Sequence, residues 1–115
     1  MTILLTVNTA PYGSEGPYNA LRLAEALAAA GSTVEVFLMG DGVHMARSGQ
    51  QPGEAHASLE RMLRSALEQD VRVACCATCC RARGLAANDL IEGVQVATIH
   101  DLAEAVERCE RTLSF

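Results

Sequence analysis

The sequence contains no tryptophan and no lysine, and only two phenylalanines and two tyrosines. All nine basic residues are arginines, and fourteen acidic residues outweigh them to give a net charge of −5. An acidic chain lacks the basic surface that binds phosphate backbones, and so few aromatic rings leave little for stacking on bases. We therefore expect no direct nucleic-acid partner. The absence of lysine also excludes a P-loop nucleotide site.

Long apolar runs are absent too, since no segment approaches the roughly 20 residues that cross a bilayer. The short apolar run at residues 2–7 has no basic segment before it and no signal-cleavage pattern after it. We therefore expect a cytoplasmic protein with no membrane partner. In that reducing compartment, five cysteines indicate catalytic, redox or metal-binding roles rather than a disulfide framework.

Short apolar runs alternate with amphipathic segments along the 115 residues, a length typical of one domain. The apolar runs predict strands at residues 3–7, 33–38, 71–75 and 94–97, with a short edge strand at 113–115. Helical spacing predicts helices at residues 18–30, 59–67 and 79–87, and a last one striped by Leu102, Val106, Cys109 and Leu113. On that stripe, Cys109 is expected to be a small buried hydrophobe.

Strands that alternate with helices over short connections predict an α/β fold. We expect a small doubly wound parallel sheet of about five strands with helices on both faces. In such sheets, ligands gather beyond the carboxyl ends of the strands. Three unusual segments follow predicted strands, at residues 8–16, 40–43 and 76–84. Their position predicts a functional site at that edge of the sheet.

Four of the five cysteines lie within six positions, at the junction of the third strand and the next helix. Cys76 and Cys79 form a C-x-x-C pair, which Cys75 and Cys80 flank. Strand side chains alternate, so Cys75 should point into the core while Cys76 emerges into the loop. A thiol at a helix N-terminus near Arg83 should have a lowered pKa and be reactive. We expect Cys75 and Cys80 to be core residues.

The C-x-x-C pair also has two other interpretations. It supplies two metal ligands where structural zinc needs four, and His44, His56 and His100 occur singly, so we expect no metal. A thioredoxin-like oxidoreductase is disfavoured because Ala77 and Thr78 replace the expected aromatic and proline surroundings. A reversible disulfide between the two cysteines remains open. The Gly-Asp-Gly sequence at residues 40–42 predicts a tight turn in which the aspartate bonds its own backbone or acts as an acid or base.

Three motifs resemble those of the DsrE/DsrF-like family of small sulfur-relay proteins. Residues 37–43 are similar to the family's F-x-x-G-D-[GA]-V segment, and residues 76–84 to its C-x-x-C-x-x-A-R-G pattern. Residues 21–27 match an L-x-L-A-x-x-L pattern in the first helix. The resemblance covers nearly the whole chain and implies one DsrE/DsrF-like domain over residues 1–115.

The resemblance implies that Cys76 occupies the family's sulfur-accepting position, carries a persulfide and passes its sulfur to a partner cysteine. Asp41 matches the family's aspartate, and Arg83 and Gly84 match its R-G pair. Cys79 places the chain in a C-x-x-C subgroup and is expected to resolve the persulfide or release it as a disulfide. The family also implies an oligomer, a trimer or hexamer, with sulfur donor and acceptor proteins as partners and no cofactor.

Two readings of function therefore stand. In the first, the protein is a sulfur carrier or sulfurtransferase that acts with partners. In the second, the thiols form a dithiol redox sensor within a structural or regulatory subunit, and no sulfur is transferred.

Overall fold

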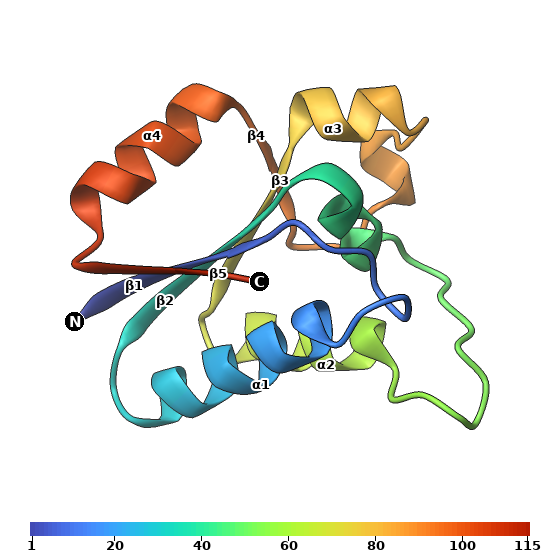
Figure 1. The fold of residues 1–115 in the computed structure, drawn as a ribbon, viewed down its shortest axis with the longest axis horizontal. Helices are drawn as coiled ribbons and strands as arrows, with labels where there is room; N and C mark the ends of the chain where they lie inside the picture. Colours follow the sequence, from blue (N-terminus) through green and yellow to red (C-terminus); the bar gives the residue numbers. More distant parts are fainter.

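The computed structural model describes residues 1–115 and is built on a five-stranded sheet (Figure 1). Its strands are β1 (Thr2–Val7), β2 (Thr33–Leu38), β3 (Arg72–Cys76), β4 (Gln95–Ala97) and β5 (Arg111–Ser114). They lie in the order β4-β3-β2-β1-β5, and every neighbouring pair is parallel. The predicted α/β fold with a parallel sheet is confirmed.

Helices cover both faces of this sheet. Helices α1 (Gly16–Ala29) and α2 (Leu59–Glu68) lie on one face, and α4 (Ile99–Arg108) lies on the other (Figure 1). The short helix α3 (Ala77–Ala82) continues directly from β3, and the 3₁₀ helices η1 (Gly40–Ala46) and η2 (Ala87–Asp89) complete the structure. None of these helices has the length and apolar character needed to cross a membrane.

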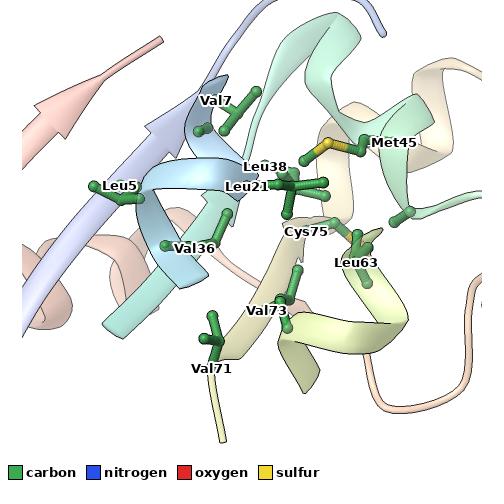
Figure 2. Packing of buried hydrophobic residues seen from close by; sticks show 14 of the residues in the cluster. Leu5, Val7, Leu21, Val36, Leu38, Met45, Leu63, Val71, Val73 and Cys75 are labelled. Atoms are coloured by element: carbon green, nitrogen blue, oxygen red, sulfur yellow. The ribbon is translucent and has the colours of Figure 1, made fainter. Parts of the chain in front are cut away.

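The two faces carry cores of very different size. The face under α1 and α2 holds a cluster of 21 buried residues, and the opposite face holds a cluster of five. Alternate residues of β1, β2 and β3 serve the two clusters, so Cys75 joins the large one and Cys76 the small one. Figure 2 shows Cys75 of β3 beside Leu63 of α2. The predicted alternation of these two cysteines is confirmed.

The first predicted helix is confirmed, although it begins two residues earlier and ends one residue earlier than predicted. Pro17 lies in the first turn of α1, where its missing N–H costs no hydrogen bond. Gly31 follows the C-terminal residue Ala30 with a φ of +95°, a conformation that suits glycine. In α2, the Ser58 side chain accepts a hydrogen bond from the backbone N–H of Arg61 at 3.2 Å.

The predictions for the helix after β3 were wrong at both ends. The strand runs one residue further than expected, to Cys76, and α3 begins at once with Ala77. The helix ends at Ala82, because Gly84 has a φ of +69° and turns the chain away. Residues 87–89 form a separate 3₁₀ turn instead of extending α3.

The last predicted stripe was wrong as well. Helix α4 ends at Arg108, and Leu113 pairs with Leu5 in the edge strand β5. Cys109 is half-buried rather than buried, and its thiol donates a hydrogen bond to a Glu35 carboxylate oxygen at 3.4 Å. Val106 faces outward, at 49% exposure. The predicted apolar stripe thus continues past the end of α4, and its last member, Leu113, belongs to the strand β5.

Candidate functional site

The candidate site lies beyond the carboxyl ends of β2 and β3, where two of the three predicted segments, at residues 40–43 and 76–84, meet. Helix η1 follows β2 and packs against the end of β1 at Gly42. Helix α3 follows β3 and touches η1 through two hydrogen bonds, which involve Cys79 and Arg83. The 40–42 segment and the cysteine cluster, 39 residues apart in sequence at Gly40 and Cys79, therefore form one site.

Cys76 is the hinge between strand and helix. It is the last residue of β3, pairs with Ala97 of β4, and also serves as the residue that precedes the first turn of α3. Its side chain lies on the α4 face against the small apolar cluster and is only 6% exposed. The prediction that Cys76 emerges into a loop was therefore wrong, because the strand extends to include it.

Two opposing effects set the pKa of the Cys76 thiol. Burial raises it, but the backbone N–H groups of Cys79 and Thr78 and the Cys79 thiol favour the thiolate. The positive charge of Arg83 acts in the same direction. The net result is that the pKa of Cys76 lies below its ordinary value. A thiol with a lowered pKa is more often present as the thiolate, which is the nucleophilic form.

The pKa of the Cys79 thiol is shifted in the opposite direction. Its half-buried sulfur accepts a hydrogen bond from the backbone N–H of Gly40 at 3.2 Å. Burial and the neighbouring Cys76 sulfur raise the pKa of Cys79 and outweigh the effects of Gly40 and Arg83. The site thus joins a thiol whose pKa is lowered to one whose pKa is raised. Such a pair suits a nucleophile and a resolving thiol.

Arg83 ties the cysteine helix to η1. Its Nε donates to Oδ1 of Asp41 at 3.0 Å, and its Nη1 donates to the carbonyl oxygen of Cys79 at 3.1 Å. The prediction that Asp41 bonds its own backbone in a tight turn was wrong, because its carboxylate holds Arg83 instead. Asp41 is largely exposed, so the ion pair adds about 0–1 kcal/mol of stability and acts by orienting the guanidinium. Gly84 contributes the turn that ends α3.

Cys75 and Cys80 lie behind this site, within the large core. The Cys80 thiol donates to the Cys75 sulfur at 3.5 Å, and both residues are buried. Burial, followed by the Cys80 thiol, raises the pKa of Cys75 to about 12. The prediction that both are core residues is confirmed.

The histidines lie apart from the cysteines. His56 packs edge-on against Tyr12 with ring centroids 5.8 Å apart, while His44 lies in η1 and His100 is exposed on α4. No three histidine, cysteine or acidic side chains are placed so that they could share a metal ion.

Sequence reasoning missed the backbone of η1. The Gly40 N–H that bonds Cys79 belongs to a residue with a φ of +52°, and Gly42 packs directly on the Val7 carbonyl group. Both glycines stand in the motif at residues 37–43, which was read as a tight turn. The available signal was the pair of glycines flanking Asp41, which indicates close backbone approach as readily as a turn.

Known proteins resemble this chain over its full length. The sequence profile of the DsrE/DsrF-like family matches residues 1–115. Protein MK0008 of Methanopyrus kandleri is 41% identical over 113 residues, which cover 98% of this chain and 93% of that protein. A Vibrio parahaemolyticus protein named as a sulfurtransferase TusD homolog is 31% identical over 128 residues and covers 100% of this chain and 98% of its own length.

One relative is similar in both sequence and structure. Protein YchN of Escherichia coli is 39% identical over 115 residues, which cover 98% of this chain and 97% of that protein. The crystal structure of the E. coli protein matches with a TM-score of 0.94 at 38% identity and covers 100% of this chain and 99% of its own. The chain belongs to the DsrE/DsrF-like family.

Proposed function

We propose that this protein is a sulfur-relay protein in which Cys76 carries a persulfide. The observation that carries the proposal is the pairing of Cys76, whose pKa is lowered, with Cys79, whose pKa is raised, at the start of α3. Family membership and the Vibrio relative named as a sulfurtransferase homolog support the same reading.

The transfer consists of two sulfur exchanges. The Cys76 thiolate attacks the outer sulfur of a donor persulfide, and the donor leaves as a thiolate. A thiolate of the acceptor protein then attacks the outer sulfur on Cys76, and Cys76 leaves as a thiolate. A thiol with a lowered pKa both attacks at neutral pH and departs well, so one residue serves both steps.

Burial of Cys76 fits a carrier. The residue is only 6% exposed, and limited access of bulk water limits side reactions of a bound persulfide. Cys79 offers a second exit. Its sulfur attacks the inner sulfur of the Cys76 persulfide, hydrosulfide leaves, and a Cys76–Cys79 disulfide remains.

Asp41 and Arg83 have supporting roles in this proposal. The carboxylate holds the guanidinium against the carbonyl group of Cys79, and the guanidinium charge favours the Cys76 thiolate. Gly84 has a positive φ and turns the chain directly after Arg83, the residue that follows α3. We place the relay in the cytoplasm, in a trimer or hexamer that meets donor and acceptor proteins.

Intact-mass spectrometry tests the assignment. Fully reduced protein is exposed to glutathione persulfide, beside Cys76→Ser and the matched control Cys109→Ser, which changes a cysteine at the end of α4. We expect the wild type and the control to gain one sulfur atom and Cys76→Ser to gain none. Equal sulfur on Cys76→Ser would refute the role of Cys76.

The dithiol sensor remains the second candidate, because Cys76 precedes α3 and Cys79 lies in its first turn. In that case, mild peroxide forms the Cys76–Cys79 disulfide, and reduced Cys79→Ser, which cannot release sulfur through that disulfide, gains no sulfur from glutathione persulfide.

A further inference from the structure

The proposed function leaves two of the four clustered cysteines without a role. Cys75 and Cys80, called here the core pair, have sulfur atoms 3.5 Å apart, with residue exposures of 0% and 3%. Cys76 and Cys79, called here the site pair, lie at the same junction of β3 and α3. Each core cysteine is the sequence neighbour of a site cysteine.

The junction itself creates the two pairs. Strand β3 contributes one thiol to each face of the sheet, and the first turns of α3 contribute the other two. Cys79 packs against both buried clusters, the large one that holds the core pair and the small one that holds Cys76. Cys79 therefore links the surroundings of the two pairs at the end of β3.

We propose that the core pair is a second redox site, which reduces a disulfide formed between Cys76 and Cys79 and itself becomes a Cys75–Cys80 disulfide. The inference rests on the proposed function, because release of hydrosulfide through Cys79 would leave the site pair oxidised. Two electrons from the core pair then restore Cys76 as a carrier once, before an external thiol has to reduce the Cys75–Cys80 disulfide.

The exchange balances within the chain. The Cys80 sulfur attacks one sulfur of the site disulfide, forms a mixed disulfide and releases the other site sulfur as a thiolate. Cys75 then attacks Cys80 in the mixed disulfide, and the second site sulfur leaves. The two protons of the core pair pass to the two released sulfurs, so one disulfide is exchanged for another.

The direction of exchange follows from the two surroundings. Backbone N–H groups and Arg83 stabilise the reduced site pair as a thiolate, and stabilising the reduced form makes its disulfide the stronger oxidant. The core pair gains no such stabilisation, since it lies among apolar side chains. A disulfide carries no charge, so a Cys75–Cys80 disulfide can lie among the apolar side chains of the large core without the cost of burying a charge. The contact at 3.5 Å leaves little movement for a bond of about 2.05 Å.

A time course on the wild type tests the proposal. Fully reduced protein receives one equivalent of diamide, a two-electron thiol oxidant, and samples are quenched in acid at successive times. Free thiols are blocked with light N-ethylmaleimide, disulfides are reduced, and the released thiols take the heavy reagent. Tandem mass spectrometry of the tryptic peptide then assigns the label to each cysteine.

We expect heavy label first on Cys76 and Cys79, and at the end predominantly on Cys75 and Cys80. Heavy label that stays mainly on the site pair overturns the proposal. In Cys80→Ala the label should remain on the site pair, whereas in Cys109→Ala it should migrate as in the wild type. Migration in Cys80→Ala would also overturn it.

The outcome is separable from that of the relay. Sulfur loading of Cys76 is measured on reduced protein, where the core pair need not react. Loading without migration overturns only the second redox site, and migration without loading overturns only the relay.

Discussion

Replacing Gly42 by alanine should destabilise the protein through one steric contact. A Cβ at this position would lie 2.9 Å from the carbonyl carbon of Val7 and closer still to its oxygen. The oxygen cannot retreat freely, because it accepts a hydrogen bond from the N–H of Met39 at 2.9 Å. Gly42 itself has no positive φ, so the penalty comes from space and not from backbone conformation.

The magnitude has two parts. Overpacking against a fixed neighbour costs about 1–3 kcal/mol. Weakening the Met39–Val7 hydrogen bond adds about 0.5–1.5 kcal/mol. We therefore expect Gly42→Ala to lower the free energy of unfolding by roughly 1.5–4.5 kcal/mol, within a typical total of about 5–15 kcal/mol. At about 4 °C per kcal/mol this corresponds to a fall in Tm of roughly 6–18 °C.

Urea denaturation at one fixed protein concentration measures the change. The matched control is Gly13→Ala in the loop after β1, where the added Cβ would lie 3.8 Å from its nearest neighbour. That variant should stay within about 1 kcal/mol of the wild type, since ordinary contact and a less flexible unfolded chain favour it slightly. A Gly42→Ala variant as stable as the control would refute the close packing of η1 on β1.

Two further predictions concern charge. Arg83→Gln should raise the pKa of Cys76, because it removes the guanidinium that favours the thiolate. The pH profile of iodoacetamide alkylation should then move to higher pH. The profile of the control variant Arg81→Gln should stay in place. An unmoved profile for Arg83→Gln would show that Arg83 does not stabilise the Cys76 thiolate. Stability should fall between about pH 9 and pH 12, because folding raises the pKa of Cys75 from 9.0 to about 12, so the folded state holds a proton that the unfolded state loses. The slope is at most about 1.4 kcal/mol per pH unit. Urea titrations from pH 7 to pH 10.5 measure this slope. An equal slope in Cys75→Ala would show that a group other than Cys75 causes the loss of stability.

Periodicity alone was enough to predict the sheet. Short apolar runs with polar breaks mark strands buried on both faces, and β2 was predicted with its observed bounds. The alternation of Cys75 and Cys76 followed from the strand period of two. The ends of helices and strands were harder to predict, because they depend on turns and on contacts with other segments that the apolar pattern does not contain. Gly84 stops α3 although the alanines after it favour helix, and β5 takes Leu113 because β1 offers it a free edge.

The site was predictable in part for the same reason. The motifs at strand ends singled out Cys76, Cys79, Asp41 and Arg83, and the parallel sheet brings those ends together. The hydrogen bond from Gly40 to Cys79 was not predictable, because it depends on how η1 packs against α3. The burial of Cys76 depends on α4, which crosses the opposite face.

Strand register gives the four cysteines their different chemistry. A shift of β3 by one residue would carry every side chain to the other face, so Cys75 would take the place of Cys76 before α3. That shift would also carry Val73 to the α4 face and bring Arg72 to its place in the large core, at a cost of about 1.5–3 kcal/mol for the lost burial of Val73 alone. The apolar residues of β3 therefore decide which cysteine precedes α3. Core packing thus selects the sulfur that lies beside the first backbone N–H groups of α3.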